Sequence, residues 1–322
     1  SFIGLVGSEM CIRDRAGFAW LSFAFDAGPL GFVLSALPGA LLLGTGVPSF
    51  LAPGERRLNH YMALGGVVGG LFGVAGIFAW GPFEGLLLIG LSVASFLSAG
   101  RLSIHEVRGV EGTPPADGSL RQAAEVAVDE ALLATMSARM VMPSLDEHPR
   151  IVAEVREAIE QFEARGVLEK PELYHATPPL LESPRIDEAQ LGKLRYQRLR
   201  FESGYEPVVD EPGRDRWLSY TPNRTAHAWV LEHDNPGRPW LVCIHGYQMG
   251  SPLIDLRAFR AAELHHQQGM NLLLPVLPLH GPRAIGRQSG DGFLAGDALD
   301  TIHGVTQALF DIRRCLSWIR AR

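Results

Sequence analysis

The chain has 322 residues and a formal net charge of −6, and it contains no basic tract. These properties exclude a nucleic-acid-binding protein that relies on a basic patch. The three cysteines are far apart and lack CxxC spacing, which excludes a disulfide framework and a zinc site built on cysteine pairs. Charged residues are nearly absent between Ala27 and Gly100 and frequent from Arg101 onward. This asymmetry predicts a membrane part followed by a soluble part.

The first segment, residues 1–15, is SFIGLVGSEMCIRDR and lacks an initiator methionine. It resembles the translated adapter read-through found at the ends of some metagenomic reading frames. We therefore expect it to be a non-native lead-in and assign it no part in the fold. The alternative, a native amphipathic lead-in, stays open.

Residues 16–108 are expected to form a membrane region with about three spans. The uncharged runs are 27–51, 61–83 and 85–100. The first two exceed the roughly 20 residues that a helix needs to cross the hydrocarbon core, and the third is shorter. The second run contains two GxxxG pairs, Gly66 with Gly70 and Gly69 with Gly73, which permit close approach of helices.

The basic residues around these runs predict an orientation. Arg56 and Arg57 lie between the first and second runs, and Arg101 and Arg108 follow the third. By the positive-inside rule, the Arg56 loop and everything after Gly100 face the cytoplasm. The alternative for this region is a soluble domain with buried hydrophobic helices.

Residues 109–190 are expected to form a linker and amphipathic helices. The glycine- and proline-rich stretch 109–118 is the linker, and a first helix is predicted over 120–142. A second helix begins after Asp146, the predicted N-cap, and ends near Gly166. The charged residues of this second helix are expected to form a solvated face: Glu154, Arg156, Glu157 and Glu163.

From about residue 191 to 322 the pattern changes to short strands and helices. The predicted strands are 194–201, 225–232, 239–244 and 271–276, and the predicted helices are 252–268 and 297–322. After an antiparallel start, strands and helices alternate. This order predicts an α/β domain with a mostly parallel sheet and right-handed crossovers.

Two glycine-containing loops follow the last two predicted strands. One is HGYQMG, from His245 to Gly250, and the other contains His280-Gly281-Pro282-Arg283. An apolar strand, this first loop, a helix and a second apolar strand resemble the first half of an α/β-hydrolase, and the two loops are similar to those of bacterial esterases and dienelactone-hydrolase-like enzymes.

The resemblance covers about 194–322 and implies an oxyanion hole, because the loop after the third strand of that fold supplies a backbone N–H to it. By position, the donors are the N–H groups of Tyr247 and Gln248. The resemblance further implies that His245 and Gly246 organise the loop.

The second loop supplies two candidate residues for the rim of a substrate site, His280 and Arg283. His280 would contact substrate or make a structural loop contact. Arg283 would bind a carboxylate or phosphate, or pair with Asp291 or Asp297. His265 and His266 are adjacent near the end of a helix, where neighbouring residues do not share a face, so we expect capping and surface solvation and no shared metal.

The catalytic serine of the resembled family lies in a G-x-S-x-G elbow, with the acid and the histidine base later in the chain. No such motif occurs here, and the helix that ends at Arg322 lies where the elbow is expected to follow. We therefore expect a serine esterase or acyl-hydrolase tethered to a bacterial inner membrane, with the nucleophile, acid and base absent from this chain, no cofactor and no metal. Its partners would be the lipid bilayer and a small ester or acyl substrate. The alternative is a non-catalytic hydrolase fold that serves as a membrane scaffold or binding module.

Overall fold

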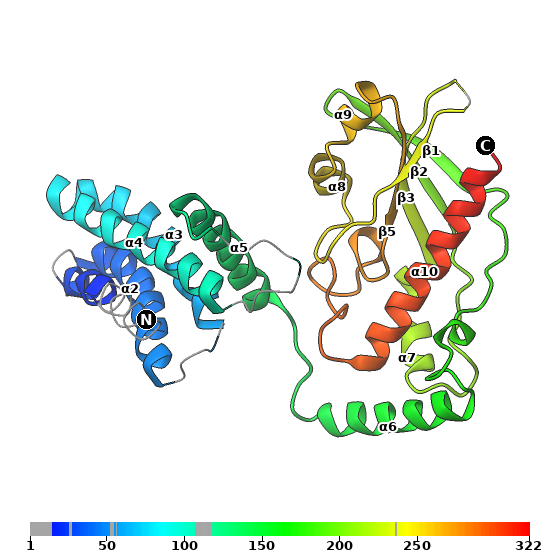
Figure 1. The fold of residues 1–322 in the computed structure, drawn as a ribbon, viewed down its shortest axis with the longest axis horizontal. Coiled ribbons are helices and arrows are strands. Elements are labelled where there is room, and N and C mark those ends of the chain that lie inside the picture. Colours follow the sequence, from blue (N-terminus) through cyan, green and yellow to red (C-terminus); the bar gives the residue numbers. More distant parts are fainter. Residues whose placement is uncertain are drawn as a thin grey trace. The chain divides into compact units, whose positions relative to one another are not determined.

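The computed structural model describes residues 15–25, 28–51, 55, 57–106, 112, 117–235 and 237–322. The predicted lead-in up to residue 14, Arg56, Arg108 and most of the predicted 109–118 linker lie outside the described residues. The chain forms two compact units, one ending at Arg139 and the other beginning at Met140. Figure 1 shows the helices and strands of each unit.

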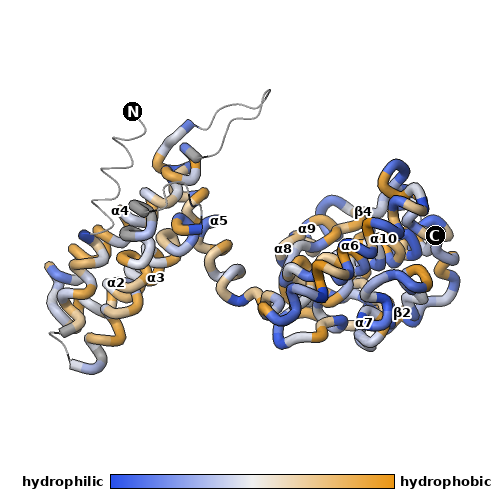
Figure 2. Tube along the Cα trace, turned by 90° about the horizontal axis from the view of Figure 1, so that it is seen from below, coloured by the Kyte–Doolittle hydropathy of each residue, from blue (hydrophilic) through white to orange (hydrophobic). Residues whose placement is uncertain are grey.

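The first unit is helical, with four long helices in the described residues. They are α2 (Gly28–Leu51), α3 (Arg57–Ala79), α4 (Pro82–Glu106) and α5 (Leu120–Arg139). Among the residues described, α3 and α4 are long and apolar enough to cross a membrane, whereas the apolar part of α2, Gly31–Thr45, is shorter. Two of the three predicted spans therefore meet the length criterion. Hydrophobic residues prevail along α2 and α3 (Figure 2).

Glycines on one side of α3 allow α4 to approach closely. A Cβ atom added at Gly66 would lie 2.7 Å from the Phe96 Cβ atom, and one at Gly73 would lie 2.5 Å from an Ile89 side-chain carbon, whereas one at Gly70 would meet no atom within 4 Å. Of the predicted pair Gly66 and Gly70, therefore, only Gly66 faces α4, whereas both members of the pair Gly69 and Gly73 do.

Helix α5 belongs to the first unit, which corrects its predicted place in the connecting region. Its buried residues form an alanine stripe: Ala123, Ala127, Ala131 and Ala134. A Cβ atom on Gly100 of α4 would lie 1.9 Å from the carbonyl oxygen of Ala123. Small residues on both helices thus permit contact between their backbones, and the first unit continues to Arg139.

The second unit is built on a five-stranded mixed sheet. Its strands are β1 (Arg185–Leu191), β2 (Leu194–Glu202), β3 (Thr225–Leu231), β4 (Trp240–Val242) and β5 (Asn271–Val276), in the order β1-β2-β3-β5-β4. Among these strands only β4 and β5 pair in parallel. The prediction of a mostly parallel sheet is therefore wrong for the described strands. The two-residue Gly192-Lys193 turn forces β1 and β2 to be antiparallel.

Helices cover both faces of the sheet (Figure 1). Helix α10 (Ala298–Arg320) contributes Cys315 and Trp318 to the core on one face, and α8 (Pro252–Ala258) and α9 (Ala261–His266) contribute Leu256 and Ala261 to the core on the other. Alternate strand residues supply the two cores, as the period of a strand requires. The helix predicted over 252–268 is divided in two, because Arg260 adopts a left-handed conformation with φ of 51°.

Helix α6 (His148–Ala164) begins one residue later than predicted, with Glu147 and not Asp146 at the N-cap. Its Glu154 carboxylate accepts hydrogen bonds from Arg150 at 3.0 Å and from Arg216 at 2.8 and 2.9 Å. Arg216 lies on α7 (Arg214–Ser219) and also bonds Asp300 of α10. The prediction that Glu154 belongs to a solvated face is wrong, because it forms part of an ion-pair network that holds α6 against α7 and α10.

Candidate functional site

The two glycine-containing loops lie together because β4 and β5 are adjacent and parallel. Parallel neighbours end at the same edge of a sheet, and ligands of open α/β sheets bind in the crevice outside the carboxyl ends of such strands. The loop after β4 runs from His245 to Gly250, and the loop after β5 runs from Leu277 to Arg283. The fold thus brings together the two motifs that lie about thirty residues apart in the sequence.

His245 joins the two loops through both of its ring nitrogens. The N–H of Leu277 donates to Nε2 at 3.0 Å, and Nδ1 lies 2.8 Å from the carbonyl oxygen of Gly246. Because Nε2 accepts, Nδ1 carries the proton and donates to Gly246. Burial lowers the pKa of His245, which favours this neutral form. A ring whose two nitrogens are both used in this way positions the loop and is not free to act as a base.

The two predicted oxyanion donors are backbone N–H groups of the loop after β4. Among the described residues, no protein acceptor receives a hydrogen bond from the backbone N–H of Tyr247 or of Gln248. Both residues are half-buried, and Gln248 adopts a left-handed conformation with φ of 63°. A non-glycine residue in this region is uncommon and costs free energy, so the surrounding loop must hold it there.

Ser289 and two glycines hold the loops against each other. The Ser289 hydroxyl accepts a hydrogen bond from the N–H of Gly281 at 2.8 Å and donates one to the carbonyl oxygen of Met249. A Cβ atom on Gly281 would lie 1.9 Å from the carbonyl oxygen of Gly250. Only glycine fits at this contact, because a Cβ atom at position 281 would overlap the backbone of the other loop. No motif in the sequence pointed to this contact of Ser289.

His280 is fully buried, which corrects the prediction that it lies at the rim of a site. Its Nδ1 donates to the carbonyl oxygen of Pro278 at 2.8 Å, and Nε2 has no partner among the described residues. The ring packs against those of His245 and Phe293. Burial lowers the pKa of His280 to about 4, so the ring is neutral at pH 7. The structural contact, one of the two roles considered for His280, is the one observed.

Arg283 is also fully buried, so its predicted place at the rim is wrong as well. Its guanidinium group donates to the carbonyl oxygens of Val276 and Asn223, at 3.0 Å each, and forms an ion pair of 3.0 Å with Asp311 of α10. The predicted partners, Asp291 and Asp297, are not used. The loop after β5 turns inward at Arg283 because this side chain satisfies two backbone carbonyls and one carboxylate in the core.

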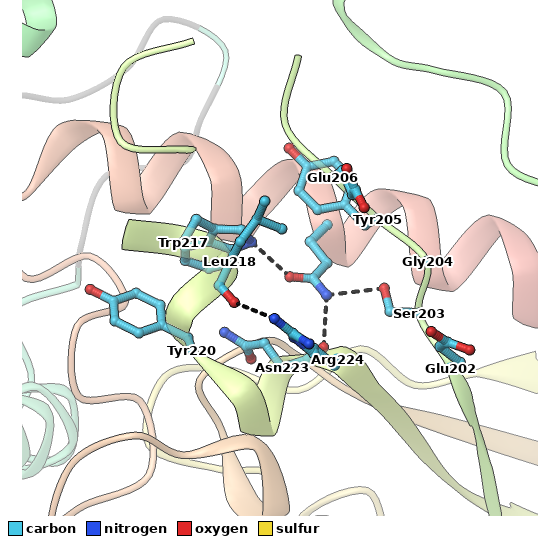
Figure 3. Close-up of a pocket in the computed structure, with 11 residues that line it drawn as sticks. Glu202, Ser203, Gly204, Tyr205, Glu206, Trp217, Leu218, Tyr220, Asn223 and Arg224 are labelled. Carbon is cyan, nitrogen blue, oxygen red and sulfur yellow. Dashed lines mark hydrogen bonds between the residues drawn. The ribbon is translucent and has the colours of Figure 1, made fainter. Parts of the chain in front are cut away.

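A cavity of about 190 Å³ lies behind this loop, between the end of β2, α7, the short helix η3 (Thr221–Arg224) and α10. Figure 3 shows the side chains that line it, among them Ser203, Trp217 and Asn223. The Gln307 amide accepts from Trp217 Nε1 at 3.0 Å and donates to the Ser203 hydroxyl at 3.0 Å and to the Asn223 carbonyl oxygen at 2.9 Å. The Asn223 side chain accepts from the N–H of Leu279 at 2.9 Å. The cavity wall therefore supports the loop after β5, which sequence analysis did not foresee.

The adjacent histidines of α9 lie away from the two loops. His265 is buried, stacks on His233 with ring centroids 3.8 Å apart, and bonds the carbonyl oxygen of Met270 at 2.9 Å. Neither predicted role describes His265, because it is buried and its ring bonds a carbonyl oxygen beyond the end of α9. Within the described ranges, no group of three or more histidine, cysteine or acidic side chains could hold a metal ion.

Comparison with known proteins gives relatives without an assigned activity. No family model matches the chain. The chain is 43% identical over 209 residues to an uncharacterised protein of Mycobacterium tuberculosis strain CDC 1551, and 42% identical over 209 residues to an uncharacterised protein of a second strain of that species. These residues make up 65% of this chain and 50% of each relative. The chain thus spans about half the length of the curated relatives it matches.

Proposed function

We propose that this chain is part of a membrane-tethered serine hydrolase of the α/β-hydrolase type, in which the loop after β4 stabilises the oxyanion formed from an ester or acyl substrate. The observation that carries the proposal is the pair of unused N–H groups at Tyr247 and Gln248, at the carboxyl end of a parallel strand pair. Donors fixed before reaction stabilise charge that develops on a carbonyl oxygen. The nucleophile, acid and base would come from residues outside this chain.

The mixed sheet supports the same proposal. The strand β4, the loop after it, the helices α8 and α9 and the parallel strand β5 follow one another in the order that the resemblance to α/β-hydrolases implies. Among the described strands, β4 pairs with β5 alone, so its other edge is open. The side chain of Leu241 in β4 is 38% exposed, and that of Ile244, two residues beyond the end of β4, is 54% exposed. An apolar edge of this kind favours pairing with a further strand. A strand that carries a serine elbow would extend the sheet there, beside the Tyr247 loop.

Tethering to a membrane is supported by the first unit. Helices α3 and α4 are long and apolar enough to span, and they present exposed aromatic side chains, with Phe78 87% and Phe83 76% exposed. Exposed apolar surface on this scale needs a cover of lipid or protein. With the charge pattern of the sequence, this supports an inner-membrane protein whose second unit faces the cytoplasm.

The experiment is to translate the parent gene beyond Arg322, express the whole protein and label it with a fluorophosphonate that reacts with activated serines. We expect a G-x-S-x-G motif and labelling of its serine. Tyr247→Pro removes the N–H donor and should lower kcat for an ester substrate by about 10²–10³-fold, the usual loss of one oxyanion donor. Tyr247→Phe keeps the N–H and is the matched control, so it should retain most of the activity.

Two results would overturn the proposal. One is a residue unable to act as a nucleophile at the elbow position, together with no labelling, which would favour the non-catalytic scaffold. The other is a labelled enzyme in which Tyr247→Pro and Tyr247→Phe hydrolyse the ester equally well. In that case the enzyme would be a serine hydrolase whose oxyanion donors lie elsewhere.

A further inference from the structure

A second cleft lies on the α8–α9 side of the sheet, away from the loops that follow β4 and β5. It has a volume of about 480 Å³ and lies between the β1–β2 turn and the two short helices. This volume is in the range of sites for small molecules, about 300–1,000 Å³. Its lining consists of three leucines, four charged residues, one glycine and one alanine. Neither the proposed hydrolase chemistry nor the sequence motifs assign this cleft a role.

Three leucines form the aliphatic part of the cleft. Leu191 and Leu194 flank the two-residue turn and face each other across the hairpin. Leu256 of α8 is buried in the core on this face of the sheet, and the two hairpin leucines pack against that core. The apolar surface of the cleft is therefore continuous with the hydrophobic core and is fixed by it. An aliphatic chain placed there would gain about 25 cal/mol for each Å² of apolar surface removed from water.

Cationic side chains surround these leucines. Lys193, Arg257 and Arg260 line the cleft together with one acid, Glu263. Arg260 forms an ion pair with Glu263, which neutralises both. Neither the Lys193 nor the Arg257 side chain has a hydrogen-bond or ion-pair partner in the part of the chain that the structure describes. Two unneutralised positive charges thus stand beside an apolar cleft.

We propose that this cleft binds a single-chain anionic amphiphile, a free fatty-acid carboxylate of medium chain length. The alkyl chain would lie along Leu191, Leu194 and Leu256, and the carboxylate would pair with Lys193 and Arg257. Charge-assisted hydrogen bonds to a carboxylate are about twice as strong as neutral ones, so the two cations select an acid over an alcohol of the same length. The inference does not depend on the proposed hydrolase activity.

The test uses the full chain in nanodiscs of phosphatidylcholine, with decanoate that carries a photoreactive diazirine at its chain end. We expect saturable labelling of residues around the β1–β2 turn and α8, with decanoate competing at least tenfold better than decan-1-ol. The variant Lys193→Gln/Arg257→Gln should lose at least tenfold in affinity. Arg156→Gln/Lys170→Gln removes the same charge from exposed positions elsewhere in the second unit, and it should bind as the parent chain does.

Three outcomes would overturn the proposal. The first is equal affinity in the two double variants, since the lost charge would then act at long range only. The second is equal competition by decan-1-ol, which would make the cleft a general apolar site. The third is labelling of the cleft by anionic lipid alone in nanodiscs that contain it, without labelling by free decanoate. That result would assign the two cations to a membrane surface.

Discussion

The ion pair between Arg283 and Asp311 connects the loop after β5 to α10 inside the core. Both side chains are buried, and burial raises the pKa of the Asp311 carboxyl while the guanidinium group, 3.0 Å away, opposes that shift. Ser203 also donates to Asp311, at 2.6 Å. A complete buried ion pair of this kind adds little net stability. Removal of one partner lowers the stability strongly, because it leaves a buried charge without a partner.

Replacement of the arginine should therefore destabilise the second unit strongly. We expect Arg283→Met to lower the free energy of unfolding by roughly 3–5 kcal/mol, because it leaves an unpaired buried carboxylate. Chemical denaturation followed by tryptophan fluorescence would measure the change. Arg287→Met, at an exposed position of the same segment, should shift it by less than about 0.5 kcal/mol. Similar losses in the two variants would mean that the pair does not form in solution.

The lowered pKa of the buried His280 predicts that the folded chain loses stability in acid. Its pKa is about 4 in the folded chain because of burial, against about 6.5 in an unfolded one. The folded state therefore binds fewer protons between these values. The stability contributed by neutral His280 is complete above pH 6.5 and falls as the pH decreases from 6.5 to 4. Urea midpoints of the parent chain and of His280→Gln at pH 7.5 and 5 should show a smaller acid loss in the variant. Equal acid losses would contradict the assigned burial.

At the scale of elements, glycine placement decides how closely helices pack. In the first unit, Gly66 of α3 faces the backbone of α4, whereas Gly70, one turn further, faces open space. In the second unit, Gly281 lies against Gly250 and joins two loops. A sequence motif such as GxxxG does not distinguish these environments, because it records spacing along one helix and not the direction of the neighbour.

The two α3 glycines therefore give a matched pair of variants. Gly66→Ala would place a Cβ atom 2.7 Å from Phe96 Cβ and 2.9 Å from the Ser92 carbonyl oxygen, and should destabilise the helix pair by about 1–3 kcal/mol. Gly70→Ala meets no atom and should leave stability unchanged or raise it, since alanine is the better helix former. Thermal unfolding in detergent, followed by circular dichroism, would measure both. Equal melting temperatures of the two variants would contradict this packing of α3 on α4.

The whole molecule combines a unit rich in apolar helices with an α/β unit, and the two make different demands on their surroundings. The chain is continuous through the coil around Met140, where one compact unit gives way to the next. Exposed apolar side chains on α3 and α4 are stable against lipid and costly in water. The second unit has cores on both faces of its sheet and includes every residue of the two loops.

Cell fractionation should distinguish the chain that contains the apolar helices from a chain that lacks them. We expect the chain expressed in bacteria to remain in the membrane pellet after extraction with alkaline carbonate, which removes peripheral proteins. A variant that begins at Met140 lacks α3 and α4 and should appear in the supernatant. Release of the longer chain by carbonate would contradict a membrane-spanning first unit, and retention of the shorter one would place a second membrane contact on the α/β unit.

The sequence by itself determined the positions of most helices and strands, since hydrophobic periodicity and capping are local properties. Helix α10, for example, begins at Ala298, one residue after its predicted start at Asp297, and the Asp297 carboxylate accepts from the N–H of Asp300. The sequence also located the two loops, because a histidine-glycine pair after an apolar run can be recognised without the structure. The carboxyl ends of β4 and β5 could then be expected to hold a site.

Only the tertiary structure decided which polar residues are buried. His280 and Arg283 have the composition of a site rim, yet partners distant in the sequence, such as Asn223 and Asp311, draw the loop after β5 into the core. Similarly, β5 pairs antiparallel with β3 and parallel with β4, which makes the sheet mixed. Both outcomes depend on pairing between segments far apart in the chain, and such long-range pairing leaves no periodic signal in the sequence.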